Sequence, residues 1–315
     1  MNSYTFTAKS KLTEQELREI QELSEVCNHF DKITLKLNED MLADRPGTGT
    51  NDFLCYDQGK LVGYGALFVF HQGEAEVSGM VHPDYRGQGI FRKLQSMMEQ
   101  ECQHRQIPAL LFIVQRGSSS GKAYMERAGA AYSVSEYWME WEAAGKEGTT
   151  VKEREGALAV GSVSGKQSAN ANMAVRLRPS TPEDMERLIQ LNVLGFQMDE
   201  ERAREMSAKL EHDPKRLTYI IEHESAGSVG KISVSKQADH AFIYGFVVDP
   251  AQQGKGIGKK ALMQSIDMLR KEGFEKIILE VATENSTALT LYEACGFEVK
   301  AANDYYQYPL QAPEL

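Results

Sequence analysis

The pattern of apolar and polar positions in the first half of the chain predicts a mixed α/β unit. Residues 12–30 place Leu12, Ile20 and Cys27 on one face of a helix that Thr13 caps, with Glu16 three residues later. Two apolar segments flank a turn at 57–60 and predict a hairpin. The remaining predicted elements are strands at 74–81, 109–115 and 132–141, and helices at 91–105 and around Tyr124.

The second half repeats this order of elements. Strands are predicted at 175–178, 218–222, 228–235, 241–248, 276–282 and 305–309, and helices after Ser180, from about 259 to 272 and at 286–295. Matching features keep a constant offset, since Pro250 minus Pro83 and Gly256 minus Gly89 both give 167. Gly230 with Gly63 and Gly296 with Gly129 give the same difference. A constant offset of this kind indicates two copies of one unit.

The composition changes between the two copies. From Ala143 to about Ala174 the chain consists mostly of Gly, Ser, Ala, Lys, Glu and Asn, which is typical of a flexible linker. We therefore predict an N-terminal domain at 1–143, a linker at 144–173 and a C-terminal domain at 174–315. The predicted fold class is α/β (α+β), with two tandem units that each have a mixed central sheet flanked by helices.

The charge and the cysteines of the chain limit which partners and metals are expected. The 315 residues carry 45 acidic and 35 basic side chains, a net charge of −10, which argues against nucleic acid or an anionic membrane as the main partner. The four cysteines are far apart and lack metal-ligand spacing, so we expect reduced thiols and no metal. Neither a leader pattern nor an apolar span of membrane length occurs, and we expect a cytoplasmic protein.

A glycine-rich turn follows the predicted strand at 241–248 and reads Gln253-Gly254-Lys255-Gly256-Ile257-Gly258. Its spacing matches neither a Walker loop nor the dinucleotide fingerprint. Glycines between a strand and a helix leave main-chain N–H groups and the positive helix end free for an anion, and a phosphate is the obvious ligand. The alternative interpretation is a turn that serves only tight strand-to-helix packing.

This loop, followed by the segment from Asn285 to Phe297 (NSTALTLYEACGF), resembles the GNAT superfamily of acyl-CoA-dependent N-acetyltransferases. The resemblance covers nearly the whole chain as two copies, a layout similar to that of tandem members such as mycothiol synthase. It implies acetyl-CoA as co-substrate, with the pyrophosphate on the loop and the pantetheine arm along the splayed strand before it. The implied cofactor-binding residues are Val247, Val248, Gln253, Gly254, Lys255, Gly256, Ile257, Gly258, Lys259, Asn285 and Tyr292.

The resemblance further implies that Tyr292 is the general acid that protonates the departing thiolate. A tyrosine that only packs its ring on the sheet is the alternative. Asn285 would hydrogen-bond the cofactor arm, cap the following helix, or do both. The general base stays open between Glu280 on the fifth strand, His240 and an ordered water.

The same loop is degenerate in the first half. The offset of 167 pairs Gly258 with Phe91, Tyr292 with Met125 and Asn285 with Ser118. Glu76 lies where a base could be, but no matching acid accompanies it. A candidate second CoA-like site remains at Val81, Arg86, Gly87, Gln88, Gly89 and Ile90. We interpret the segment 116–122 as a mobile loop.

We therefore predict an acetyl-CoA-dependent N-acetyltransferase whose C-terminal half transfers acetyl to a primary amine, most simply that of a small molecule. A non-catalytic acyl-CoA-binding regulatory protein and a protein lysine acetyltransferase are the alternatives. The expected state is a monomer or weak dimer. Side chains that fit an acceptor pocket or a core equally well are Phe196, Phe242, Tyr244, Tyr305 and Tyr306.

Overall fold

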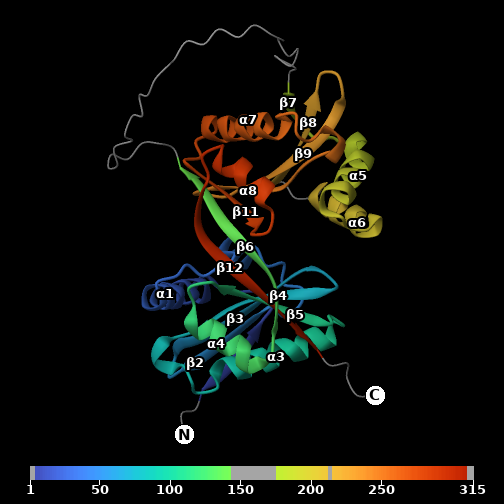
Figure 1. Ribbon diagram of the computed structural model, residues 1–315. Coiled ribbons are helices and arrows are strands. Elements are labelled where there is room, and N and C mark those ends of the chain that lie inside the picture. Colours follow the sequence, from blue (N-terminus) through green and yellow to red (C-terminus); the bar gives the residue numbers. More distant parts are fainter. Residues whose placement is uncertain (1–3, 143–174, 212–214, 311–315) are drawn as a thin grey trace, which may run out of the picture. The chain divides into compact units, whose positions relative to one another are not determined.

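The computed structural model describes residues 4–142, 175–211 and 215–310, which form two compact units. Unit 1 contains the chain up to Trp138 together with 281–286 and 299–310 (Figure 1). Unit 2 contains 139–142, the described residues between Val175 and Glu280, and 287–298. The predicted linker at 144–173 lies outside the described residues.

Unit 1 is a mixed sheet with helices on both faces. Its strands run in the order β1-β2-β3-β4-β5-β12-β6, and β4 with β5 is a parallel pair. The elements are β1 Thr5–Lys9, α1 Glu14–Asp31, α2 Glu39–Ala43, β2 Asp52–Asp57, β3 Lys60–His71, β4 Glu74–Val81, η1 Pro83–Tyr85, α3 Ile90–His104, β5 Ala109–Gln115, α4 Ser119–Ala128, β6 Ala131–Glu142 and β12 Glu298–Pro309.

Alternation along the strands of unit 1 divides its core between the two faces of the sheet. Phe53 and Leu67 pack with Leu94 of α3 in one cluster, and Leu54 and Phe68 pack with residues of α1 in the other. The predicted cap of α1 is confirmed, because Thr13 and Glu16 form a reciprocal capping box.

The last strand departs from the predicted domain boundary at 174–315. β12 pairs antiparallel with β5 over its second half, with Asp304 opposite Val114 and Pro309 opposite Ala109. Tyr306 and Tyr308 pack against the α3 cluster of unit 1, and Arg116 donates to Asp304 at 2.8 Å. This aromatic face explains why the strand completes unit 1 although the chain reaches it after unit 2.

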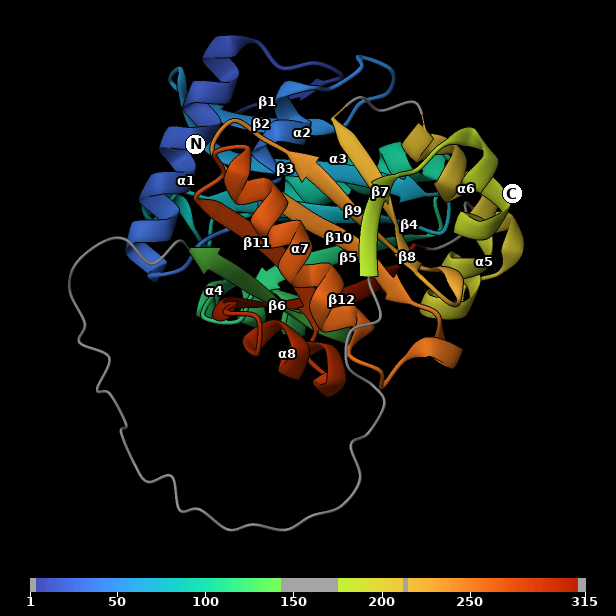
Figure 2. The same ribbon diagram turned by 90° about the horizontal axis from the view of Figure 1, so that it is seen from above.

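Unit 2 has the same kind of layered arrangement (Figures 1 and 2). The sheet order is β11-β10-β9-β8-β7. The elements are β7 Val175–Pro179, η2 Pro182–Asp184, α5 Met185–Phe196, α6 Glu200–Glu211, β8 Arg216–His223, β9 Gly227–Lys236, β10 Ala241–Val248, η3 Pro250–Gln252, α7 Ile257–Lys271, β11 Lys276–Ala282 and α8 Ser286–Glu293.

The two faces of unit 2 are covered by different helices. Val248 packs with Ile257 and Ala261 of α7, which Figure 2 shows lying across the strands. The neighbouring Val247 points the other way and meets Gly195 of α5, where an added Cβ would overlap the valine side chain. Val248 therefore lies on the face of the sheet that α7 covers, and Val247 lies on the face that α5 covers.

The backbone reproduces the repeat read from the sequence. α7 and β11 begin 167 residues after α3 and β5, since 257 minus 90 and 276 minus 109 both give 167. Gly89 and Gly256 are left-handed caps with φ of 82° and 76°. Sequence analysis did not identify β1, α2 or α6. The segment 116–122 was predicted as a mobile loop, but Ser118 caps α4, which begins at Ser119.

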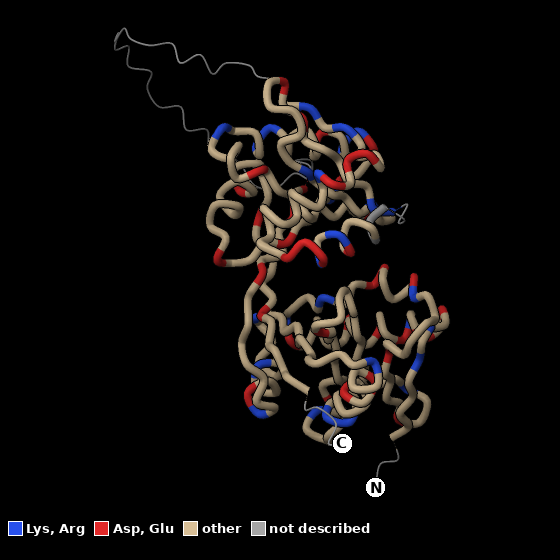
Figure 3. Tube along the Cα trace, turned by 90° about the vertical axis from the view of Figure 1, so that its right-hand side faces the viewer, with Lys and Arg blue, Asp and Glu red and all other residues tan. Residues whose placement is uncertain are grey.

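Charges of both signs are interspersed along the described part of each unit (Figure 3). The four cysteines are buried and form no disulfide, as expected. Among the described helices, none is both long and apolar enough to cross a membrane.

Candidate active site

The glycine-rich loop of unit 2 is a cradle of main-chain N–H groups at the start of α7. Gly254 and Gly256 adopt φ of 75° and 76°, a region that side chains disfavour. The main-chain N–H of Gln253 donates to the carbonyl of Pro250 (3.3 Å), and the N–H of Lys260 donates to the carbonyl of Gly256 (3.2 Å). Between them, the N–H groups of 254–258 donate to no acceptor in the described part of the chain. Five such donors at a helix N-terminus can bind a phosphate.

The loop is tied to the end of β10 by its first side chain. The Gln253 amide donates from Nε2 to the carbonyl of Val248 at 2.9 Å. In unit 1 the Arg86 guanidinium donates from Nε to the carbonyl of Val81 at 3.0 Å, so both copies hold their loops in the same way. Lys255 turns back and donates to the carbonyl of Ala251 at 3.2 Å.

β10 separates from β11 just before the loop. The parallel pairing covers only 241–243 against 277–279, so the register pairs stop at Ile243 and Leu279. The splay that the family resemblance implied is therefore present. Beyond it, β10 continues to Val248 without a further register pair to β11 in the described residues, and an extended ligand can bind along this part of the strand.

A β-bulge accompanies this separation. The register with β9 shifts between Tyr244 and Val247, and Gly245 within the bulge has φ of +56°. In unit 1, Ala66 with Ser78 and Gly63 with Val81 keep a single register through the equivalent part of β4. The bulge thus distinguishes the two copies, and bulges of this kind commonly accompany active sites.

Tyr292 reaches this region from α8. Its ring centroid lies 6.5 Å from that of Phe246 in the bulge and 6.1 Å from that of Phe297. A Cβ placed on Gly258 would lie 3.7 Å from Cζ of the same Phe246. Phe246 therefore joins the loop, the bulge and the tyrosine. Burial raises the pKa of Tyr292 to about 12, so the hydroxyl is a proton donor at neutral pH.

The other predicted site residues are spread more widely. Lys259 is exposed on the first turn of α7. Glu280 is half-buried on β11, one residue after the pairing with β10 ends. Asn285 immediately precedes α8, and its main-chain N–H donates to the carbonyl of Ala282 at 2.9 Å.

His240 lies at the far end of β10. Its Nδ1 is 2.8 Å from the carboxylate of Asp239. Five residues of strand separate it from Gly245, a distance of roughly 16 Å at the usual rise per residue. This separation makes His240 a poor candidate for the general base.

In unit 1 an aromatic side chain occupies the corresponding region. The Phe91 ring lies 4.9 Å from that of Tyr124 and 6.4 Å from that of Phe112 on β5. A Cβ on Gly79 of β4 would be only 2.7 Å from Phe91. The ring therefore fills the space where β4 and β5 separate.

The remaining loop side chains of unit 1 are engaged within the unit. The Arg86 guanidinium forms two hydrogen bonds to Asp31, at 2.7 and 2.9 Å. Gln88 accepts a hydrogen bond from Tyr4, while Gly87 and Gly89 keep the same left-handed turn as in unit 2 and Ile90 is buried. Unit 1 thus retains the main-chain loop without the open strand edge.

Three of the aromatic candidates for an acceptor pocket lie in unit 2. Phe242 stacks on Tyr244 with centroids 6.2 Å apart, and Phe196 is 41% exposed at the end of α5. Tyr305 and Tyr306 belong instead to unit 1, where Tyr305 is buried and donates to Glu136. Sequence analysis missed the bulge, for which the signal was a glycine inside an apolar strand, Gly245.

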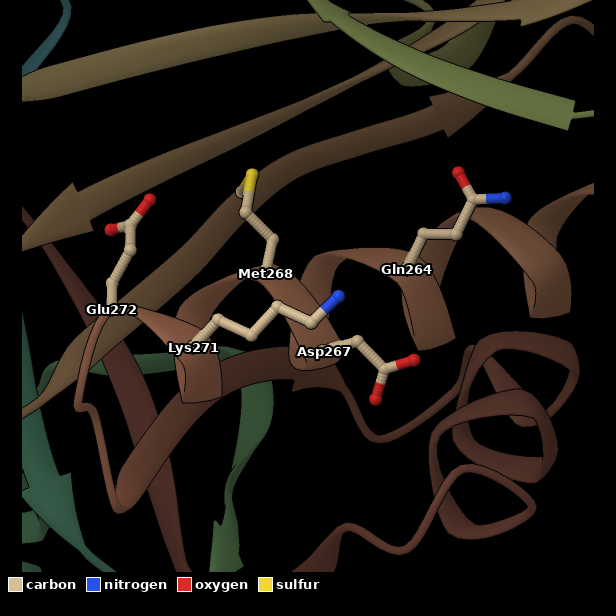
Figure 4. Close-up of a pocket in the computed structure, with 5 residues that line it drawn as sticks. All are labelled: Gln264, Asp267, Met268, Lys271 and Glu272. Carbon is tan, nitrogen blue, oxygen red and sulfur yellow. The ribbon is translucent and has the colours of Figure 1, made fainter.

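A surface hollow of about 400 Å³ lies along α7 but is separate from this site (Figure 4). It is lined by Gln264, Asp267, Met268, Lys271 and Glu272. All five come from the second half of α7 and its end, away from the loop at its start. Across the described ranges there is no group of three or more His, Cys, Asp or Glu side chains that could hold a metal.

Comparisons with known proteins identify the family. The model of the acetyltransferase (GNAT) family matches residues 15–130 and 185–297. The mycothiol acetyltransferase of Kytococcus sedentarius is 26% identical over 97% of this chain and 98% of its own length. The [ribosomal protein bS18]-alanine N-acetyltransferase of Escherichia coli is 39% identical over 69 residues, 22% of this chain and 47% of its own.

Two solved structures share the fold over nearly their whole lengths. The GCN5-related N-acetyltransferase from Sphaerobacter thermophilus has a TM-score of 0.71 at 20% identity, with 98% of this chain and 97% of that chain covered. A tandem GNAT protein from the clavulanic acid biosynthesis pathway has a TM-score of 0.70 at 17% identity, with 99% and 100% covered. GNAT acetyltransferases in general use acetyl-CoA as co-substrate. With both halves matched by the family model, this chain belongs to the GNAT family as a tandem N-acetyltransferase.

Proposed function

We propose that unit 2 binds acetyl-CoA and transfers its acetyl group to a primary amine of a small molecule. The observation that carries this proposal is the convergence on Phe246, which contacts Tyr292 and lies beside Gly258 at the loop. Within the described residues, unit 2 is the one of the two units that combines an open cradle and a splayed strand with a bulge and a buried acid.

In this proposal the pyrophosphate binds the N–H groups of 254–258 and the N-terminus of α7. The pantetheine arm runs along the free edge of β10, where main-chain groups near Val247 and Val248 hydrogen-bond it as a neighbouring strand would. Lys259 adds positive charge beside the phosphates. Lys255 contributes less, because its ammonium is already engaged by Ala251 and Gln252.

The chemistry then needs an amine that attacks the thioester carbon while the C–S bond breaks. Tyr292 donates its proton to the departing thiolate, which favours a group that stays protonated at neutral pH. Glu280 lies on β11 where the two strands separate and is our candidate for the proton acceptor from the amine. In this proposal unit 1 is the degenerate copy, because Phe91 closes its strand edge and Met125 replaces the acid.

The matched glycines Gly256 and Gly89 test the assignment of cofactor binding to unit 2. Gly256→Val forces a β-branched side chain onto a left-handed cap and disorders the cradle, so we expect at least a tenfold weaker affinity for acetyl-CoA. Gly89→Val makes the same change in unit 1 and should leave that affinity within about twofold. Isothermal titration calorimetry with acetyl-CoA measures both. Equal losses in the two variants would contradict the proposal.

The transfer itself is tested by the release of free CoA thiol from acetyl-CoA in the presence of a panel of amines. We expect thiol release that depends on one class of small amine, with the acetylated amine detected by mass spectrometry. Thiol release with no amine product, or product only on protein lysines, would contradict a small-molecule N-acetyltransferase.

A further inference from the structure

A buried lysine lies beside the β10 bulge. Lys231 is in the middle of β9, between Ile220 of β8 and Val247 of β10, and only 1% of it is exposed. Lysine is almost never buried to this degree without a partner of opposite charge. A lysine at this position therefore calls for an explanation beyond packing.

The surroundings of this ammonium group supply no counter-charge. Its Nζ lies 5.7 Å from the centroid of the Phe196 ring and 3.4 Å from where a Cβ on Gly245 would be. The nearby hydroxyls of Ser233 and Thr218 hydrogen-bond each other at 2.8 Å. Within the described ranges, Nζ makes neither an ion pair nor a hydrogen bond. Desolvation lowers the pKa of Lys231 to about 8.

The equivalent position in unit 1 shows what a satisfied buried group looks like in this fold. Subtracting 167 from 231 gives Tyr64, which is also fully buried. Its hydroxyl donates to Asp52 at 2.7 Å, and Asp52 in turn pairs with Arg45 at 3.1 Å. Unit 1 completes its buried polar group internally, whereas the described residues of unit 2 give the Lys231 ammonium no hydrogen-bond or ion-pair partner.

Lys231 lies close to the place where the acceptor would react. It lies on the α5 face of the sheet, next to the bulge at which the proposed thioester would be presented. The Phe196 ring above it is 41% exposed at the end of α5, so the ammonium is one side chain away from solvent. Lys231 is therefore a charged side chain of β9 that lies directly beside the bulge.

We propose that Lys231 binds an anionic group of the acceptor, a carboxylate or a phosphate carried by the same small molecule as the reacting amine. Such a group supplies the charge that the buried ammonium lacks, and a charge-assisted hydrogen bond formed away from water is strong. The Phe196 ring contacts the ammonium through its face, and the paired hydroxyls of Ser233 and Thr218 lie nearby. This inference rests on the proposed function and names its substrate class.

Matched acceptor pairs test the proposal by thiol release. One arm compares amino acids with their amides, and the other compares amino sugar phosphates with the free amino sugars, so the preferred arm identifies the anion. The wild-type enzyme should have at least a tenfold higher kcat/KM for the anionic member of one pair. Lys231→Met keeps the length and removes the charge, and it should abolish this preference by raising KM for the anionic member.

Two further variants serve as controls. Lys236→Met removes a lysine from the same strand that pairs with Glu272 at the surface, and it should keep the preference. Lys231→Arg retains a cation and should restore part of the preference that Lys231→Met loses.

Equal loss of kcat/KM for charged and uncharged members in Lys231→Met would overturn the anion-binding role. If wild-type enzyme acetylates no amine in the panel, the proposed function fails separately. Calorimetric titration with the same acids and phosphates, without acetyl-CoA, then still decides the role of Lys231. Binding to wild type that weakens about tenfold in Lys231→Met supports it, and equal or absent binding in both contradicts it.

Discussion

At the residue scale, the protonation of Tyr292 is the property that the site depends on. The buried ring between Phe246 and Phe297 stabilises the neutral phenol and raises the pKa to about 12. A raised pKa means that the acid form persists to higher pH than in an exposed tyrosine, whose value is about 10. The donor is therefore present throughout the neutral and mildly alkaline range.

A pH profile of kcat tests this property. With saturating acetyl-CoA and acceptor, we expect no loss of kcat through Tyr292 ionisation between pH 7 and about pH 10.5. Any rise across this range would reflect deprotonation of the acceptor amine or of the base. The measurement is thiol release against pH, with circular dichroism as the control for folding. A falling limb with an apparent pKa below 10, in protein that is still folded, would contradict this account of Tyr292.

A single residue also separates the two copies. Phe91 and Gly258 are the second residues of equivalent helices. Phe91 fills the space between β4 and β5, whereas Gly258 leaves contact distances of 3.4 to 3.7 Å for an added Cβ. The offset of 167 pairs Gly258 with Phe91, and the sequence therefore predicted a crowded helix start in unit 1. What the sequence could not show is that the ring reaches Gly79 on the splayed strand.

At the element scale, the entry to α5 depends on an ion pair. Arg178 on β7 donates to Asp184 at 2.6 Å, and Asp184 also closes a capping box with Thr181. The hydrogen bond from Arg178 is the main cause that lowers the pKa of Asp184 to about 2. Because the pKa falls on folding, this stabilisation is present above the unfolded value near 3.8 and is lost as the pH falls through about 2.

Substitution of Asp184 measures how much the ion pair contributes to the stability of unit 2. Asp184→Asn should lower the unfolding free energy of unit 2 by about 1 kcal/mol at pH 7, the usual scale for a lost cap. The difference from wild type should shrink as the pH falls toward 2. Hydrogen exchange of β7 and α5 reports on unit 2 alone. Glu205→Gln at an exposed position of α6 is the control. An undiminished difference at pH 2 would contradict the role of the ion pair.

The elements themselves were predictable where short-range patterns determine them. The capping signal of α1, the hairpin of β2 and β3, and the loop between β10 and α7 follow from residues close together in the chain. The bulge at Gly245 depends on pairing between β9 and β10, and the burial of Lys231 depends on α5 packing over β9. These features need contacts across the sheet, and no local pattern specifies them.

At the scale of the whole molecule, the duplication was evident from the offset of 167, but the division of the strands was not. β12 follows α8 in the chain yet completes the sheet of unit 1, because its aromatic face packs with that core. The end of β6, residues 139–142, belongs in turn to unit 2, where Glu140 forms an ion pair with Lys276 of β11. Each unit therefore contains a segment that the order of the chain would place in the other unit: most of β12 in unit 1 and the end of β6 in unit 2.

In the proposed function, one of the two copies performs the chemistry, with Tyr292 as the acid. The most direct test measures thiol release and acetyl-CoA affinity together in Tyr292→Phe and in Tyr124→Phe, a control in the equivalent helix of unit 1. We expect Tyr292→Phe to lose at least tenfold in kcat with acetyl-CoA affinity nearly unchanged, the scale of lost acid catalysis. Tyr124→Phe should retain both values. Unchanged turnover in Tyr292→Phe, or an equal loss in the two variants, would contradict the account.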